Sequence, residues 1–592
     1  MPFLSNWPDS KPTIVSKRNR DGTVRWWMRL VLVAWMAGLA IAPQPALAGS
    51  TKLVSMPAFG DVESFAISPD GAYVVYLADA ETDGVLDLYS VPLNGATPVQ
   101  LNNLLVTGGE IGSFEISADS KRVVYRADQE ANDVWELYSV PIAGPANARV
   151  KLNRPLPAGG DVLSYQISPD GSHVVYRADQ DSVRSFPDVG GVYELYSVPI
   201  AGPAAAGVKI NHPLRFEVQI CMPGEDKYAD DVVSFKISPD SSRVIYRAKR
   251  YLDCDHVHEL FSVPIAGPVD DVVQLSGTMV TGGDLSEYEV SADNSRVVYQ
   301  ADQDTDGVFE LYSVPVGGPA GAGVKLNNPL VTGGDVSGFS ISGDSSRVVY
   351  KADQETNGLY ELYSAPISGP AGSGVKLTAP EVFGGTSLHV NNFSLSPDGA
   401  WALYHAKLDD APCWELYSVP AVGPAAQGVN LNGPLPTGAY GVVMEIRISL
   451  DSSRVVYHAD RDTALQLDLY SVPIGGPATA AVRLNLPPVA GGAISWWSYQ
   501  ISPDGSRVAY QADQDIDNVT ELYSVPIAGP DTAGVKLNAP LVDGGDVDGF
   551  AFSPVSSRVV YAADQDTDDV VELYVTGTEY TMYLPLVLRS YP

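Results

Sequence analysis

The sequence predicts an all-β protein, a β-propeller of ten four-stranded antiparallel blades. The first observation is repetition: a unit of about fifty residues occurs ten times, and the phrase ELYSVPIAGP recurs from Glu136, Glu194 and Glu521. The second is that each unit holds four short β-rich runs separated by turn residues. The third is that no helical periodicity of useful length follows Ala48. Together they indicate propeller blades and exclude helical and leucine-rich repeats.

The copy that begins at Asp284 shows why each run is expected to be a strand. Tyr288–Ser291 alternates as a short first strand, and Arg296–Ala301 is a β-branched and aromatic second strand. A polar turn leads to a third strand, Glu310–Val314, which ends at Pro315 because proline lacks the N–H that a ladder needs. After a glycine-rich link, Val324–Asn327 is predicted as the outer, fourth strand.

The ends of the repeat region bear on how the ring closes. The tenth copy lacks the VKLN phrase, whereas the region after Ala48 opens with Thr51–Val54 in the matching register. We therefore expect one closed ring of residues 49–578 in which this segment completes the last blade. Two smaller rings are the alternative, and the C-terminal tail, residues 579–592, competes for the same place. The ten copies are marked by third-strand leucines at Leu88, Leu137, Leu195, Leu260, Leu311, Leu362, Leu416, Leu469, Leu522 and Leu573.

Residues 1–48 have the pattern of an export signal. Basic residues precede the apolar run Leu30–Ala42, and Ala46–Ala48 fits a small-residue cleavage site. Translation starts either at Met1, with an extended basic region, or at Met28. We expect export to an extracellular, cell-surface or periplasmic location and no transmembrane segment in the mature chain, because the apolar run is short for a membrane span.

Three phrases of the repeat resemble a known family. ISPDGSRVAYQAD from Ile501, ISPDGSHVVYRAD from Ile167 and LSPDGAWALYHA from Leu395 are similar to WD40-like PD40 repeats, the TolB type of β-propeller. The resemblance covers almost all of residues 51–575 and implies the propeller fold. It implies no particular function, because such propellers serve many roles. The N-terminal domain of TolB-like proteins and the C-terminal hydrolase domain of related peptidases have no counterpart, and no G-x-S-x-G motif occurs.

The chain is strongly acidic, with a formal net charge of −34. Such a surface repels nucleic acid and attracts cations. Solubility is the simpler explanation and cation binding is the other.

The turn between the second and third strands carries carboxylates at alternate positions, a spacing typical of Ca²⁺ loops. Asp, Asn and Gly are also the residues that a plain hairpin turn prefers, so both interpretations stay open. The predicted calcium ligands are Asp302, Asp304, Asp306 and Glu310 in the best copy, Asp513, Asp515 and Asp517 in the ninth, and Asp564, Asp566 and Asp568 in the tenth.

The fourth copy departs most from the repeat. Two lengthened loops each carry a cysteine, which predicts a Cys221–Cys254 disulfide in an exported protein and leaves Cys413 as a free thiol. A metal cluster of Cys254 with His256 and His258 is the alternative. The third copy also has an insertion, and the Trp496-Trp497 pair could stack on a sugar.

These observations predict a secreted or cell-surface β-propeller that acts without catalysis as a binding or scaffold module. Calcium is the one cofactor considered. We expect a monomer whose partner is a protein or a carbohydrate, and no nucleic acid. The alternative is a propeller enzyme, a polysaccharide lyase or hydrolase, with its site in the central channel. His173, His405 and His458 lie scattered on second strands, which favours the first function.

Overall fold

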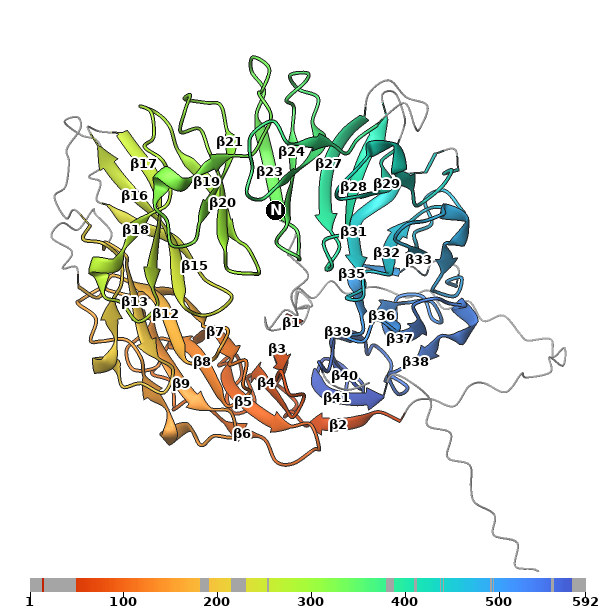
Figure 1. Cartoon of the computed structure of the whole chain (residues 1–592). Coiled ribbons are helices and arrows are strands. Elements are labelled where there is room, and N and C mark those ends of the chain that lie inside the picture. Colours follow the sequence, from red (N-terminus) through yellow and green to blue (C-terminus); the bar gives the residue numbers. More distant parts are fainter. Residues whose placement is uncertain are drawn as a thin grey trace, which may run out of the picture.

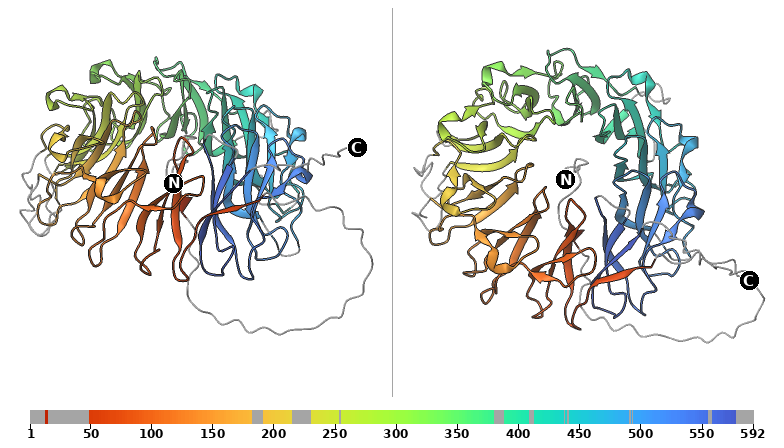
Figure 2. Two further views of the ribbon diagram at one scale, coloured as in Figure 1. Left: turned by 90° about the horizontal axis from the view of Figure 1, so that it is seen from below. Right: turned by 60° about the horizontal axis from the view of Figure 1, so that its bottom comes forward.

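Ten blades surround a central opening in a single ring (Figures 1 and 2). The computed structural model describes residues 13–14, 49–181, 191–214, 230–252, 255–379, 388–408, 413–436, 438–439, 441–489, 492, 494–554 and 558–577. Every blade is an antiparallel sheet of four strands, and the first blade gains a fifth from Thr13–Ile14 (β1). The predicted fold class is confirmed, and the two-ring alternative is wrong.

The first strands of the blades line the opening, and the fourth strands form the outer wall (Figure 1). The first strands are β3 Val62–Ile67, β7 Ile111–Ile116, β11 Val162–Ile167, β15 Asp231–Ile237, β19 Leu285–Val290, β23 Val336–Ile341, β27 Leu388–Leu395, β31 Val442–Ile448, β35 Ile494–Ile501 and β39 Val547–Phe552. The second strands are β4 Tyr73–Ala78, β8 Arg122–Ala127, β12 His173–Ala178, β16 Arg243–Leu252, β20 Arg296–Ala301, β24 Arg347–Ala352, β28 Trp401–Leu408, β32 Arg454–Ala459, β36 Arg507–Ala512 and β40 Arg558–Ala563.

The third and fourth strands complete each sheet. The third strands are β5 Asp87–Pro92, β9 Glu136–Pro141, β13 Glu194–Pro199, β17 Asp255–Pro264, β21 Glu310–Pro315, β25 Glu361–Pro366, β29 Glu415–Pro420, β33 Asp468–Pro473, β37 Glu521–Pro526 and β41 Glu572–Gly577. The fourth strands are β6 Val99–Gln100, β10 Val150–Lys151, β14 Val208–Lys209, β18 Val273–Gln274, β22 Val324–Lys325, β26 Val375–Lys376, β30 Val429–Asn430, β34 Val482–Arg483, β38 Val535–Lys536 and β2 Thr51–Val54.

Short 3-10 helices precede seven of the fourth strands. They are η1 Ala146–Ala148, η2 Ala204–Ala206, η3 Val269–Asp271, η4 Ala320–Ala322, η6 Ala425–Gln427, η7 Ala478–Ala480 and η8 Asp531–Ala533. No helix in the described parts of the chain is both long and apolar enough to pass through a bilayer.

The strand boundaries of the fifth blade follow the predicted chemistry except at the first and fourth strands. The fourth strand, β22, ends at Lys325, two residues before the predicted Asn327. The second and third strands of the fifth blade, β20 and β21, begin where the sequence predicts, and β21 ends on Pro315. The first strand, β19, starts at Leu285 rather than Tyr288, because a bulge between Leu285 and Glu287 lets the pairing with β20 extend toward the turn.

The hydrophobic core lies between blades rather than within one blade. One cluster joins Val75 and Leu88 of the first blade to Phe114 and Tyr125 of the second, and comparable clusters occupy the other junctions. The apolar side chains on both faces of the sheets pack against neighbouring blades, which explains why these strands are apolar at successive positions. Full burial of one such side chain stabilises the fold by about 1.5–3 kcal/mol.

The ring closes through the start of the propeller region. β2 pairs with β41 in the register Thr51↔Val575, Lys52↔Tyr574 and Val54↔Leu573. The segment after Ala48 therefore supplies the outer strand of the tenth blade, as the matching phrases predict. Except for β1, the predicted signal segment lies outside the described residues, and so does the tail from residue 578.

Candidate functional site

The first carboxylate of each acidic turn fixes the backbone around it. Asp302 accepts hydrogen bonds from the backbone N–H groups of Asp284, in the loop from the preceding blade, and of Gly307, at 2.8 Å. Asp79 does the same with Asp61, at 2.5 Å, and Gly84, at 3.0 Å. Asp302, a predicted calcium ligand, therefore joins the acidic turn to the loop between blades.

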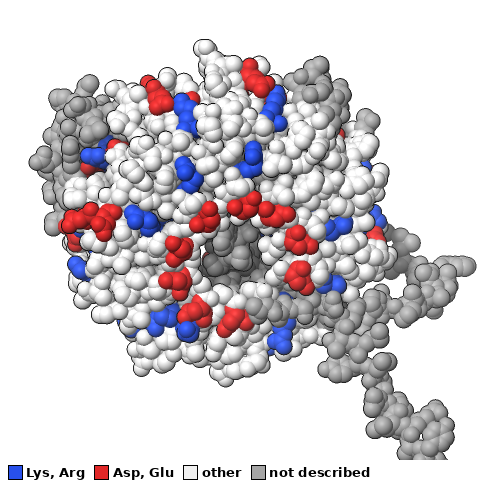
Figure 3. Space-filling model, in the orientation of Figure 1, with Lys and Arg blue, Asp and Glu red and all other residues white. Residues whose placement is uncertain are grey.

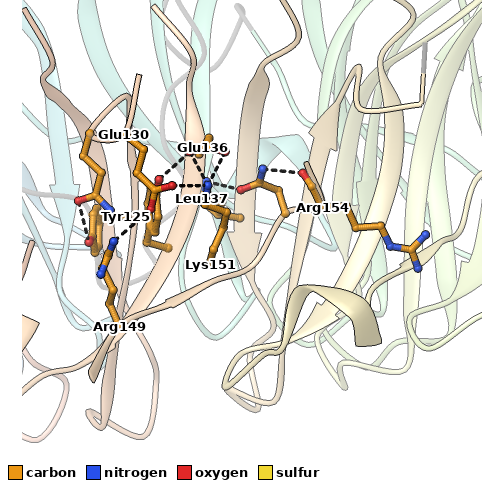
Figure 4. A network of polar contacts seen from close by, with 10 residues as sticks. Tyr125, Glu130, Glu136, Leu137, Arg149, Lys151 and Arg154 are labelled. Carbon is orange, nitrogen blue, oxygen red and sulfur yellow. Dashed lines mark hydrogen bonds and ion pairs between the residues drawn. The ribbon is translucent and has the colours of Figure 1, made fainter. Parts of the chain in front are cut away.

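The next carboxylates of the turn hold a lysine from the fourth strand. Lys325 Nζ lies 2.9 Å from Asp304 Oδ2, 2.5 Å from Glu310 Oε2 and 5.7 Å from the ring centroid of Tyr312. We call this arrangement the lysine clamp; Figure 4 shows it in the second blade, with Lys151 between Glu130 and Glu136. The six described clamp lysines are Lys52, Lys151, Lys209, Lys325, Lys376 and Lys536.

Electrostatics keep the clamp lysines charged. Burial opposes the charge on Lys325, but the hydrogen bonds and attraction of Glu310 and Asp304 outweigh it and raise the pKa of the lysine. A charge-assisted bond of this kind is stronger than a neutral one. The clamp thus ties the two-residue outer strand to the turn above it.

The predicted calcium ligands are brought together only in part. Asp515 and Asp566 lie beside Lys536 and Lys52, as Asp304 lies beside Lys325. Asp306, Asp517 and Asp568 are exposed at the turn tips. Among the described residues, no group of three or more His, Cys, Asp or Glu side chains is placed to hold a metal ion. Calcium binding stays a prediction, and in this arrangement lysine is the cation that the carboxylates hold.

A second set of carboxylates lies in the turns between first and second strands. Asp293 Oδ1 accepts from Ser291 Oγ at 2.6 Å and from the N–H of Ser295 at 3.0 Å. Its own N–H donates to Ser345 Oγ of the next blade at 3.0 Å. The nine exposed members of this set are Asp70, Asp119, Asp170, Asp240, Asp293, Asp344, Asp398, Asp451 and Asp504.

These nine residues, which we call the rim aspartates, are held in the charged form. Burial slightly opposes ionisation of Asp293, but hydrogen bonds from Ser291 and Ser295 dominate and keep its pKa below the usual value. Figure 3 shows acidic side chains gathered around the central opening, with Lys and Arg farther out. The sequence analysis did not single them out; the recurrent Ser-x-Asp phrase was the signal that could have found them.

Long polar side chains on the second strands connect neighbouring blades. Arg126 donates to the Val162 carbonyl at 3.1 Å, and Gln300 donates to the Val336 carbonyl at 2.5 Å. In the seventh and eighth blades the same position holds His405 and His458, both buried. Burial lowers the pKa of His458 to about 4, and its ring meets Tyr499 edge-on at 5.0 Å. These histidines contribute to the contacts between blades.

The fourth blade carries a tall hairpin. β16 and β17 are ten residues each and pair as far as Leu252↔Asp255. His258 Nδ1 lies 2.7 Å from Asp284 Oδ1. Cys221, Cys254 and all of the third-copy insertion (182–191) except Gly191 lie outside the described residues, as do the side chains of Trp496 and Trp497. Cys413 is free among the described residues, as predicted, and it is buried.

Comparisons with known proteins give no family. No family model and no curated protein matches the chain. A solved prolyl endopeptidase shares 12% identity at a TM-score of 0.34, over 70% of this chain and 55% of that one. Dipeptidyl peptidase 4 of Porphyromonas gingivalis shares 11% at a TM-score of 0.40, over 69% of this chain and 57% of that one. The chain thus spans little more than half of either protein.

Proposed function

We propose that this chain is an exported β-propeller, built of PD40-type repeats, that binds a cationic protein partner without catalysis. The observation that carries the proposal is the set of nine exposed rim aspartates, together with the acidic side chains that surround the central opening (Figure 3). Their carboxylates are exposed and their pKa values are lowered, whereas the clamp lysines are already paired. An opening lined by one sign of charge concentrates ligands of the opposite sign.

Two further features agree with a binding role. The chain carries a formal net charge of −34, so long-range attraction also favours a cationic partner. Of the three second-strand histidines, His405 and His458 are buried between blades, and His173 is half-buried at the start of β12. No described feature favours the lyase or hydrolase alternative over binding.

The test is the affinity for a fluorescent ten-residue oligolysine peptide, measured by anisotropy. A rim variant, Asp293→Asn with Asp344→Asn and Asp398→Asn, keeps an oxygen that can accept the turn hydrogen bonds but removes three charges. A control variant, Asp83→Asn with Asp306→Asn and Asp517→Asn, removes three charges from exposed positions of the acidic turns.

We expect the rim variant to bind about tenfold or more weakly and the control variant to stay within about threefold. We also expect the affinity to fall steeply between about 20 mM and about 200 mM salt, because exposed charges are screened. Equal weakening in both variants would show that only total charge matters, and no binding at low salt would refute the proposed function. Thermal melting of each variant checks that the ring is intact.

A further inference from the structure

In each blade the first strand has one edge that faces the central channel and is not paired with the second strand. On this side each first strand presents backbone N–H and C=O groups that the second strand does not use, and an open edge of this kind can pair with another chain. In several blades a side chain of the preceding blade occupies that edge. These pairs are Glu115 with Ile167 N at 3.2 Å, Lys236 with Tyr288 O at 2.8 Å, Glu289 with Ile341 N at 3.1 Å, and Gln500 with Phe550 O at 2.9 Å.

Before the first blade, the position that supplies this side chain in the four pairs holds no polar side chain. The residue that corresponds to Gln500 in the blade before it is Ala551, which has no polar side-chain atom. Gly549, Ser64 and Ala66 at the same junction are also short. The edge of β3 is therefore not covered from the neighbouring blade as the edge of β39 is.

At this edge the structure places an added strand. β1 pairs antiparallel with β3, with Thr13 opposite Phe65 and Ile14 opposite Ser64. Phe65 corresponds to Tyr288 and Phe550, whose carbonyls accept hydrogen bonds from Lys236 and Gln500 of the respective preceding blades. Backbone pairing in the first blade thus takes the position that side chains take elsewhere.

The segment around β1 has the composition that suits this channel. Residues 11–20, KPTIVSKRNR, contain four basic and no acidic residues. Thr13, Ile14 and the following Val15 are β-branched and favour extended backbone. A basic extended segment therefore combines backbone pairing at β3 with attraction to the rim aspartates.

We propose that the channel-side edge of β3 is a strand-addition site for an extended, basic peptide segment of a partner protein, of which β1 shows the pairing. This inference rests on the proposed function, because the rim aspartates supply the charge selection. Main-chain hydrogen bonds to a sheet edge give such sites their affinity. Removal of residues 1–48 leaves every blade with four strands, because β2 and not β1 closes the ring, and it opens the edge to the partner.

The test uses residues 49–592 and a fluorescent peptide with the sequence of residues 11–20. A second peptide carries Thr13→Pro, which keeps the charge and removes the backbone N–H that faces the Phe65 carbonyl in the antiparallel pairing. Ala551→Gln is the blocking variant, because glutamine at this position can reach the β3 edge as Gln500 reaches β39. Ser340→Gln, the same position in the sixth blade, is the matched control.

We expect the wild-type ring to bind the unmodified peptide about tenfold more tightly than the proline peptide, since a ladder bond contributes up to about a factor of ten. Ala551→Gln should lose a similar factor and Ser340→Gln should lose none. Equal binding of the two peptides, or equal effects of the two variants, overturns strand addition. If oligolysine binds and neither peptide does, strand addition is refuted while the proposed function stands.

Discussion

At the scale of single residues, the role of a carboxylate in this fold depends on which cation comes within reach. Asp304 and Glu310 have the spacing of metal ligands, yet Lys325 lies 2.9 Å and 2.5 Å from their oxygens. Asp293, in the opposite turn, is held by hydroxyl and amide donors and forms no ion pair with a lysine among the described residues. The same residue type thus contributes to stability in one turn and to surface charge in the other.

Replacing a clamp lysine should destabilise the fold. Lys325→Met leaves the largely buried Glu310 carboxylate without its cation, and we expect a loss of about 1–2 kcal/mol in the free energy of unfolding. Chemical denaturation measures it. Lys121→Met is the control: Lys121 is 78% exposed beside Asp119, so its loss should cost less than about 0.5 kcal/mol. Equal losses in the two variants would contradict a structural role for the clamp.

The sequence could predict that carboxylates gather in the acidic turn, but not what they bind. The spacing of Asp302, Asp304 and Glu310 is local, whereas Lys325 follows Glu310 by 15 residues and reaches it only when the fourth strand folds back. For the rim aspartates, the sequence could not predict that they gather in one place. Each turn by itself resembles ordinary turn chemistry, and only the closed ring assembles nine of them around one opening.

At the scale of elements, an aspartate at or just before the start of a first strand joins two blades. Asp335 accepts from the N–H of Phe309 in the preceding blade at 2.8 Å, and Asp231, at the start of β15, accepts from Tyr193 at 2.9 Å. Their surroundings give these groups different acidities. Burial raises the pKa of Asp231 to about 7 despite Arg177, the Tyr193 N–H and Lys249, whereas at Asp284 the bond from His258 outweighs burial and lowers the pKa.

The junction of the third and fourth blades should therefore respond to pH. The unfolded pKa of an aspartate is about 4, so between pH 4 and about 7 the folded state binds more protons than the unfolded state and stability falls as pH rises. Asp231→Asn removes this dependence. We compare the free energy of unfolding of the variant with that of the wild type by denaturation at pH 4 and at pH 8. We expect this difference to be about 1–2 kcal/mol more favourable to the variant at pH 8 than at pH 4. A difference that does not change with pH would contradict a raised pKa.

The boundaries of the elements were largely predictable because proline and turn residues mark them. Pro315 ends β21 as expected, and β20 covers the predicted residues. The start of β19 was not predictable, because a bulge at Leu285 depends on the partner strand rather than on local sequence. The Cys221–Cys254 disulfide between the two loops of the fourth blade stays a prediction, because both residues lie outside the described part of the chain.

At the scale of the whole molecule, the ring depends on one short strand. β2 supplies the outer edge of the tenth blade, and Lys52 forms the clamp with Glu572 and Asp566. Leu53 and Val54 are buried in the cluster between the tenth and first blades. This closure was predictable from the sequence because the phrase missing from the tenth copy is found after Ala48.

Deleting β2 should open the ring. We expect a chain that starts at residue 56 to melt at a clearly lower temperature than one that starts at residue 49, because it loses the β2 ladder, a clamp and two buried side chains. Limited proteolysis should cut the tenth blade first, since its outer edge is then unpaired. Identical melting and identical cleavage in the two chains would show that closure does not stabilise the ring.

The same closure sets an order of events during synthesis. Lys52 and its partner Glu572 are separated by 520 residues, so β2, which is made before any of the ten first strands, waits for the whole propeller region before it can pair. The other nine blades need only residues that are near in sequence, and they can form one after another as the chain emerges. A product truncated before β41 therefore keeps an unpaired β2 at an open seam of the ring, and an unpaired edge of this kind is a site of proteolysis.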